Sequence, residues 1–157
     1  MRLTGFSDYT LRVLMYLALD RDRLATIPEI AAAYGISRNH LMTVVQHLGQ
    51  TGTVETVRGK GGGLRLARPP ASIRIGEVVR AAEGDAPIVE CLSDDEGTCA
   101  IAPVCRLRRV LVDGFDALYE HLDRTTLADL VGSGRPLANV LKGPARPAAV
   151  RVAASRR

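Results

Sequence analysis

The chain has 157 residues, of which 46% are hydrophobic and only 4% aromatic, with no tryptophan. This length suits one domain, or one domain with an extension, and this composition predicts a core of aliphatic side chains. No apolar run approaches the roughly 20 residues that a bilayer-spanning helix needs, and the N-terminus shows no hydrophobic signal segment. We therefore exclude a membrane protein and expect a cytoplasmic one, in which thiols stay reduced.

The net charge of +4 is distributed unevenly along the chain. Six of the 21 lysines and arginines lie after residue 134, where there is no acid, so the preceding part carries 15 basic against 17 acidic groups. Within that part, residues 54–80 hold six basic residues and two acids, whereas residues 83–96 are acidic without a base. A confined basic patch fits a nucleic-acid footprint better than the overall charge does.

Three helices are predicted in the first 50 residues. Apolar residues at helical spacing predict a first helix that begins near Ser7 or Asp8. Residues 26–29 form a capping-box pattern with proline in the first turn, and they begin a second helix that Gly35 ends. Ser37 is the expected cap of a third helix. Two short helices joined by so tight a turn are typical of a helix-turn-helix.

A β-hairpin is predicted next. Residues 53–57 are rich in β-branched side chains, residues 58–63 form a flexible basic turn, and residues 64–66 alternate as a return strand. A fourth helix then ends at Gly84. The fold class is therefore mainly α with a small β-hairpin wing, and residues 1–84 are predicted to form a winged helix-turn-helix DNA-binding domain.

The C-terminal part is predicted to contain a long helix. Apolar residues recur at a spacing of three or four from Pro103 to Leu122, a length of about 30 Å. So long a helix at the end of a small domain has little core to cover, and pairing with a second copy would bury it in a homodimer. We assign residues 103–134 to this dimerisation helix and a short terminal helix. Residues 135–157 lack periodicity and are expected to be a disordered basic tail.

Polar residues at the beginning of the third helix are candidate DNA contacts. A recognition helix offers its N-terminal residues to base edges in the major groove, where arginine pairs with guanine and asparagine with adenine. The glycine-rich hairpin tip allows close approach and supplies charge for phosphates or a minor groove. Each residue alone could be a solvated surface position, but the combination favours double-stranded DNA. The candidates are Ser37, Arg38, Asn39, His40, Thr43, Arg58, Lys60 and Gly61.

All the cysteines of the chain, Cys91, Cys99 and Cys105, lie in one acidic loop predicted over residues 85–105. Three is an odd number for a disulfide framework. Structural zinc sites usually contain a Cys-x(2–4)-Cys pair, which is absent. The wider spacing suits an iron–sulfur cluster, whose irons are ligated separately. Zinc and merely reduced cysteines remain alternatives.

A cluster held by three thiolates needs a fourth ligand. A carboxylate is a harder and weaker ligand than a thiolate, so a site completed by one would be labile, as suits a sensor. The acids near the cysteines are Glu90, Asp94, Asp95 and Glu96.

Several segments together resemble one known family. They are Met1–Arg12, Ile36–His40, Val57–Leu66, Ile75–Arg80 and Thr126–Val131. In their residues and in their order along the chain, these segments are similar to the NsrR nitric-oxide-sensing repressors, part of a wider winged-helix iron–sulfur regulator family that includes IscR. The resemblance covers about residues 1–142. It implies a homodimeric repressor with one cluster per subunit, [4Fe–4S] in the first place and [2Fe–2S] as the alternative.

The resemblance also implies a ligand set. Cys91, Cys99 and Cys105 match the three thiolate ligands of the family. Asp8 matches the acidic residue that in NsrR-type proteins can supply the fourth ligand from the partner subunit, although by itself it would be read as a helix cap. IscR-type proteins carry a histidine three residues after the third cysteine, where this chain has Arg108. The chain departs from the NsrR pattern in one respect, because more residues separate its first two cysteines than in that family.

The expected function is therefore a transcriptional repressor and not an enzyme. Its dimer would bind a pseudo-palindromic operator, and nitric oxide would attack the cluster, release the DNA and derepress nitric-oxide detoxification genes. One alternative is a sensor of iron–sulfur status or redox state on the same fold. The other is a cluster-carrying electron-transfer subunit. No nucleophile–base pair is evident, and the glycine run at residues 59–63 lacks phosphate-loop spacing.

Overall fold

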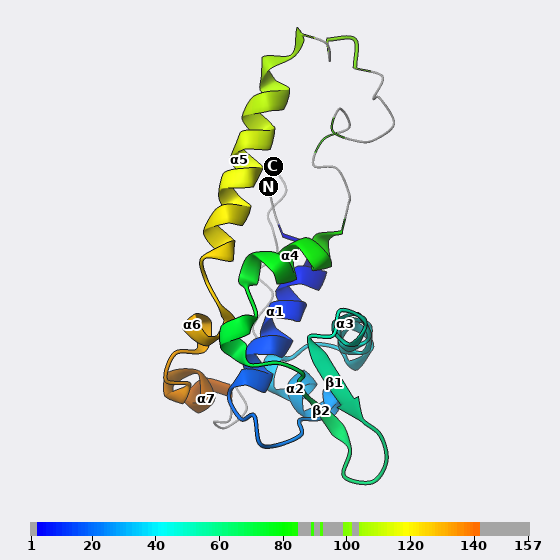
Figure 1. The fold of residues 1–157 in the computed structure, drawn as a ribbon. Coiled ribbons are helices and arrows are strands. Elements are labelled where there is room, and N and C mark those ends of the chain that lie inside the picture. The colour runs from blue at the N-terminus through cyan, green and yellow to red at the C-terminus, as the bar shows by residue number, and fades with distance from the viewer. Residues whose placement is uncertain (1–2, 85–88, 90–91, 93–98, 102–103, 142–157) are drawn as a thin grey trace, which may run out of the picture.

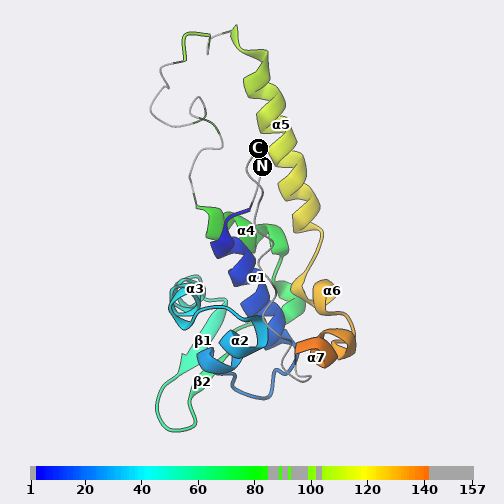
Figure 2. The ribbon, with the colours of Figure 1, turned by 180° about the vertical axis from the view of Figure 1, so that it is seen from behind.

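The computed structural model describes residues 3–84, 89, 92, 99–101 and 104–141. Its elements in chain order are α1 (Gly5–Ala18), α2 (Ile27–Tyr34), α3 (Arg38–Gln50), β1 (Val54–Val57), β2 (Gly63–Leu66), the 3-10 turn η1 (Pro70–Ser72), α4 (Ile75–Glu83), α5 (Arg106–Asp123), α6 (Leu127–Val131) and α7 (Arg135–Leu141). Figure 1 shows one body that contains all of these except α5, which projects from it as a long rod. The view from behind shows the same separation (Figure 2).

The helices α2 and α3 begin and end where the local sequence predicts. Thr26 and Glu29 form a reciprocal capping box, in which the threonine hydroxyl accepts from the glutamate N–H and the carboxylate accepts from the threonine N–H. Gly35 ends α2 at a φ of +66°, a left-handed conformation that glycine adopts without steric cost. The Ser37 hydroxyl accepts the His40 N–H at 3.3 Å and caps α3.

The helix α1 begins earlier than the sequence predicts. Thr4 is its cap and accepts the Ser7 N–H through its hydroxyl, so neither Ser7 nor Asp8 has that role. The Ser7 side chain is fully buried and donates instead to Glu83 at the end of α4. The prediction was wrong because a tertiary contact uses the hydroxyl that the local pattern assigns to capping.

The core lies where α1, α2, α3, α4 and the hairpin meet, and it is aliphatic as expected. Tyr16 is the one aromatic residue among the buried hydrophobic side chains of the described residues. Side chains from five helices and the turn before α4 are the largest that are fully buried: Leu14, Val13, Ile30, Leu41, Leu48, Val44, Ile73, Val79 and Leu127. Helices distant in sequence therefore share one core.

The hairpin is anchored to this core along one face. The antiparallel register pairs Val54 with Leu66 and Val57 with Gly63. Ala25 joins the edge of β2, where its N–H and C=O form hydrogen bonds of 3.0 and 2.8 Å with Leu64. A Cβ at Gly63 would lie 2.5 Å from the Ala25 carbonyl oxygen, so this close approach requires glycine.

The helix α5 begins at Arg106, directly after Cys105, rather than at Pro103, which lies outside the described residues. None of its residues is buried. Leu107 and Val110 are 61% and 64% exposed, whereas Tyr119 and Leu122 near the other end pack against the core. The long helix therefore presents an apolar surface that this chain does not cover.

Residues 135–141 form α7 and not the beginning of the disordered tail that the composition predicts. Gly134 accepts the Ala138 N–H at 2.8 Å, and Leu141 packs against the core. The prediction failed here because α7 is only seven residues long, too short to show a helical repeat of apolar residues in the sequence. The rest of the expected tail, residues 142–157, lies outside the described residues. None of the described helices combines the length and apolar character that crossing a bilayer requires.

Candidate nucleic-acid interface and cysteine site

The helix α3 is amphipathic, and its polar face is exposed. Leu41, Val44, Val45 and Leu48 are buried, while the side chains of Arg38, Asn39, His40 and Thr43 are exposed, as is the capping Ser37. This arrangement matches the recognition helix that the sequence predicts. The predicted contacts themselves stay a prediction.

Two residues of the same face were missed by the sequence reasoning. Gln46 and Gln50 follow Asn39 and Thr43 at helical spacing and are exposed. Both line an open groove between α3 and β1, together with Met42. The available signal was the seven-residue interval from Asn39 to Gln46, which places both on one side of a helix.

The exposed His40 also contacts another helix. Its ring stacks on Tyr9 of α1, with centroids 5.8 Å apart and planes inclined by 27°. A second ring contact joins the same helices, because Phe6 meets His47 edge to face at 5.3 Å. Two aromatic pairs therefore connect α1 to α3.

The wing tip carries the cations that are free to meet a nucleic acid. Across the basic segment of residues 54–80, other arginines are engaged in ion pairs, Arg65 with Glu55, Arg68 with Glu77 and Arg80 with Asp123. Arg58 and Lys60 are exposed and have no carboxylate partner in the part of the chain that the structure describes. Arg74, the remaining base of this segment, is exposed and donates to the Asp123 carbonyl. Of the basic residues in the segment, only those of the hairpin tip have no partner among the described residues.

The glycines of the tip are required by its shape. Gly59 and Gly61 have φ angles of +101° and +82°, in the region that other residues rarely adopt. A Cβ on Gly62 would lie 2.2 Å from the Val57 carbonyl oxygen. Figures 1 and 2 both show the hairpin on the same side of the body as α3, opposite α6 and α7. A recognition helix and a charged wing thus share one side.

The structure describes two of the three cysteines. Cys99 is exposed and Cys105 half-buried, and both are free thiols. Cys91 lies outside the described residues, and within them no three Cys, His, Asp or Glu side chains come together at a metal-binding distance. Free thiols are the donor type that ligates iron–sulfur clusters, and Cys105 directly precedes α5.

Asp8 lies in the first turn of α1 and is half-exposed. Its carboxylate accepts from Arg12 Nε at 3.0 Å and pairs with Arg12 Nη2 at 2.7 Å. In both views the beginning of α1 lies beside α4, whereas the beginning of α5, next to Cys105, lies at the outer end of the projecting helix (Figures 1 and 2). The structure does not bring Asp8 and Cys105 of one chain together.

Glu83 joins α4 to the beginning of α1, a contact that the sequence did not reveal. Its Oε1 accepts the Thr4 N–H at 2.9 Å, the Thr4 hydroxyl at 3.0 Å and the Ser7 hydroxyl. Partial burial by itself raises the pKa of the Glu83 carboxyl, but the hydrogen bonds from Ser7 and Thr4 outweigh it, and the pKa lies below its ordinary value. We call this group the Glu83 latch.

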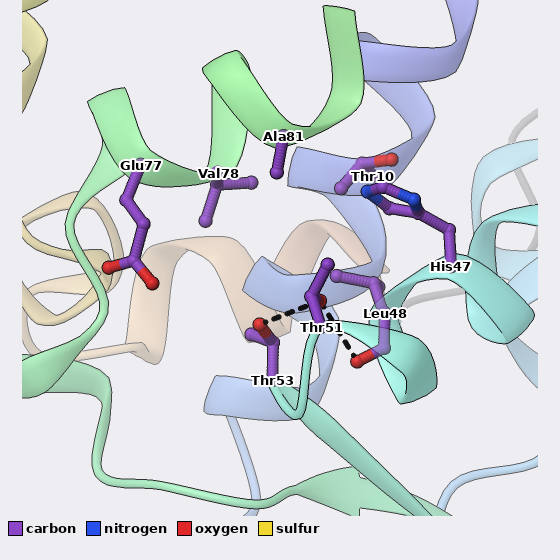
Figure 3. Close-up of a pocket in the computed structure, with 8 residues that line it drawn as sticks. All are labelled: Thr10, His47, Leu48, Thr51, Thr53, Glu77, Val78 and Ala81. Atoms are coloured by element: carbon purple, nitrogen blue, oxygen red, sulfur yellow. Dashed lines mark hydrogen bonds between the residues drawn. The ribbon is translucent and has the colours of Figure 1, made fainter. Parts of the chain in front are cut away.

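A cavity of about 20 Å³ lies between α1, α3 and α4 (Figure 3). The Thr51 hydroxyl donates to the Leu48 carbonyl at 3.2 Å and is 3.1 Å from the Thr53 hydroxyl. Thr10 lines the cavity, and its buried hydroxyl has no hydrogen-bond partner among the described residues. This volume suits about one water molecule and not a small-molecule ligand.

Comparison with known proteins gives consistent results. The model of the Rrf2 family, described as an iron-dependent transcriptional regulator, matches residues 3–133. The HTH-type transcriptional regulator NsrR of Bacillus subtilis (strain 168) is 49% identical over 143 residues, which are 90% of this chain and 98% of that protein. NsrR of Geobacillus kaustophilus (strain HTA426) is 46% identical over 90% of this chain and 97% of its own length.

Solved structures of transcriptional regulators share the fold. CymR, the global cysteine regulator of B. subtilis, superposes with a TM-score of 0.67 at 29% identity, over 86% of this chain and 98% of its own. IscR of T. potens superposes with a TM-score of 0.69 at 24% identity, over 87% of this chain and 90% of its own. The predicted winged-helix fold is confirmed.

Proposed function

The chain belongs to the Rrf2 family of transcriptional regulators, which are not enzymes, and we propose that it is a repressor that binds operator DNA as a homodimer and releases it in response to nitric oxide. The observation that carries the proposal is the joint placement of an exposed recognition helix and a charged wing on one side of the body. The response to nitric oxide is supported by the sequence resemblance to NsrR repressors.

DNA recognition would divide between the helix and the wing. Arg38 and Asn39 at the beginning of α3 suit base edges in the major groove, and Gln46 extends the same face. The exposed charges of Arg58 and Lys60 suit phosphates beside that groove. Contacts of these two kinds would supply specificity and salt-dependent affinity respectively.

The homodimer would form through α5. Its exposed apolar side chains include Leu107 and Val110, and pairing with the same helix of a second copy would remove them from water. A two-fold dimer also presents two recognition helices to two half-sites, as a pseudo-palindromic operator requires.

The sensor would be an iron–sulfur cluster, [4Fe–4S] in the first place, held by Cys91, Cys99 and Cys105 with a fourth ligand from Asp8 of the partner subunit. When bound, the cluster would supply iron that nitric oxide can attack. Asp8 lies one residue before Tyr9, whose ring stacks on His40 of α3. A change in the ligation of Asp8 would therefore act on the helix that packs directly against the recognition helix.

The proposal is tested by anaerobic titration. An operator is first selected from random duplex DNA with the cluster-loaded protein, and iron, sulfide and resonance Raman measurements define the cluster. We expect nitric oxide to lower the affinity for that operator in a gel shift, while the Cys99→Ser variant, which lacks one thiolate, gives no nitric-oxide response. Unchanged operator affinity at saturating nitric oxide would refute nitric-oxide sensing.

The Asp8→Ala variant distinguishes the proposed nitric-oxide sensor from a sensor of iron–sulfur status or redox state. We expect altered cluster spectra and altered DNA release if Asp8 is the fourth ligand. Wild-type spectra and release in that variant would favour the other sensor classes. If neither the apo form nor the loaded form bound DNA, an electron-transfer role would remain.

A further inference from the structure

The end of α5 opposite Cys105 is fastened to α4 by a polar joint. Asp123 is the last residue of α5, and its carboxylate accepts two hydrogen bonds from Arg80, one of them at 3.0 Å. Arg74 Nη1 donates to the Asp123 carbonyl at 2.7 Å. The side chain and the backbone of one residue are therefore both held by arginines, one in the last turn of α4 and one directly before it.

The joint is close-packed as well as charged. A Cβ on Gly76 would lie 2.1 Å from Asp123 Oδ1 and 3.0 Å from the Asp123 nitrogen, so α4 and α5 approach as closely as they do because residue 76 is glycine. The Arg80 guanidinium also lies over the Tyr119 ring, 4.7 Å from its centroid. The hydrogen bonds from Arg80 hold the pKa of Asp123 below its ordinary value.

The backbone beyond α5 is tied to the same place. The Ile75 N–H donates to the Thr125 carbonyl at 3.0 Å, and the Leu127 N–H donates to the Ile73 carbonyl at 2.8 Å. These two bonds flank the bridge between Arg74 and Thr126. The joint therefore has little freedom to pivot while its hydrogen bonds remain intact.

Away from the joint, α5 is not held by the rest of the described chain. Its apolar contacts with the core come from Tyr119 and Leu122, both within its last five residues, and none of its 18 residues is buried. At 1.5 Å per residue the helix is about 27 Å long, so a tilt of roughly 7° at the joint moves the outer end by about 3.4 Å, one base-pair step. A small change of angle at the joint would therefore displace the outer end of α5 by a distance comparable to one base-pair step.

We propose that the joint formed by Gly76, Arg80 and Asp123 sets the angle between α5 and the DNA-reading helices and thereby determines the half-site spacing that the dimer accepts. This inference rests on the proposed dimeric binding of DNA. The three residues are positioning residues, because none of them lies on the exposed face of α3 or on the wing tip.

The test uses duplexes with two copies of the selected half-site at centre-to-centre distances changed in single base-pair steps, and a duplex with one half-site. The joint variants are Asp123→Asn, which keeps the side-chain shape, and Gly76→Ala, which forces the helices apart. The matched control is Glu77→Gln. Glu77 lies next to Gly76 in α4, and its carboxylate pairs with Arg68 and not with α5.

We expect the wild type and Glu77→Gln to prefer one spacing by about tenfold or more, because a wrong spacing must be met by deforming the DNA. The joint variants should shift or flatten this preference while their affinity for the single half-site stays within about twofold. Circular dichroism and urea unfolding verify that each variant is folded, and the milder Asp123→Asn serves if Gly76→Ala does not fold.

Two outcomes would overturn the inference in distinguishable ways. A folded joint variant with the wild-type optimum and the wild-type preference would overturn the role of the joint alone. A wild-type protein without any spacing preference would overturn the proposed dimeric reading of DNA, and the role of the joint with it.

Discussion

Glu29 shows how one side chain can connect several parts of the body. Its carboxylate accepts the Tyr16 hydroxyl of α1 at 2.7 Å, Arg23 Nη1 at 3.0 Å and the Thr26 N–H at 3.4 Å. The hydrogen bonding from Arg23 outweighs the effect of partial burial, and with the further hydrogen bonds it lowers the pKa of Glu29 to about 2. A capping residue is thus also a link between α1 and α2.

The lowered pKa predicts the pH dependence of stability. The unfolded chain binds a proton at Glu29 near its ordinary pKa of 4.5, whereas the folded chain does so only near 2, so acid favours unfolding. The stabilisation from Glu29 is present above pH 4.5 and is lost as the pH falls through about 2. Glu29→Gln should lower the free energy of unfolding at pH 7 by on the order of 1 kcal/mol, and the difference should shrink in acid.

Urea unfolding at a series of pH values measures this difference. The matched control is Glu120→Gln, an exposed carboxylate on α5 without a hydrogen-bond partner in the described part of the chain. Its effect on the free energy of unfolding should be small. A difference for Glu29→Gln that does not change with pH would contradict the assignment.

At the scale of elements, the Glu83 latch is the contact that orders α1 against α4. Three donors from Thr4 and Ser7 converge on one carboxylate oxygen at the last residue of α4. The segment with the cysteines follows α4, and Asp8 follows Ser7. The latch therefore joins the two parts of one chain that lead to the proposed cluster ligands.

Glu83→Ala should destabilise the protein by about 1–2 kcal/mol, because it leaves the buried Ser7 hydroxyl without its acceptor. Hydrogen exchange at the amides of the first turn of α1 should accelerate in the same variant. Glu77→Ala removes a carboxylate of the same helix that forms a surface ion pair with Arg68, and it should cost less than about 0.5 kcal/mol. Equal, small losses in both variants would show that the latch is not a stabilising contact.

Element boundaries were predictable where the signal is local. The caps at Thr26 and Ser37 and the ends of α2 and α4 at Gly35 and Gly84 follow from residue types within one helical turn. The cap of α1 was not predictable, because Ser7 is used by Glu83, 76 residues away. Local chemistry decides a boundary only where no distant partner competes for the same group.

At the scale of the whole molecule, the exposed face of α5 predicts self-association. Replacing Leu107 and Val110 together by glutamate places two charges where a dimer would bury apolar side chains. Burial of each apolar side chain in the dimer would contribute about 1.5–3 kcal/mol to the free energy of association. Sedimentation should show a monomer, and circular dichroism should show unchanged helix content, because these side chains do not pack on the body. Arg109→Glu, toward the opposite side of the same helix, should remain a dimer. A dimer in the double variant would exclude this face as the interface.

The amino-acid sequence by itself determined the winged-helix class, the recognition helix and the wing, together with the candidate cysteine ligands. The inferences about the fold depend on patterns among residues close in the chain, namely helical periodicity, caps, β-branched strands and glycine-rich turns, and the cysteine candidates depend on their spacing and on the family resemblance. The same local information was sufficient to place Arg58 and Lys60 among the candidate DNA contacts. It was not sufficient to show that three other arginines of the basic segment, Arg65, Arg68 and Arg80, form ion pairs with carboxylates.

Only the tertiary structure decided which polar groups meet across the fold. Glu83 with Ser7, Arg80 with Asp123, and Tyr9 with His40 join residues that lie 31 to 76 positions apart, and α7 exists beside a core that its own sequence does not reveal. The physical reason is that such contacts depend on how whole helices pack. A hydrogen bond or close approach of this kind is formed only after the entropy of the intervening chain has been given up, and no local pattern records it.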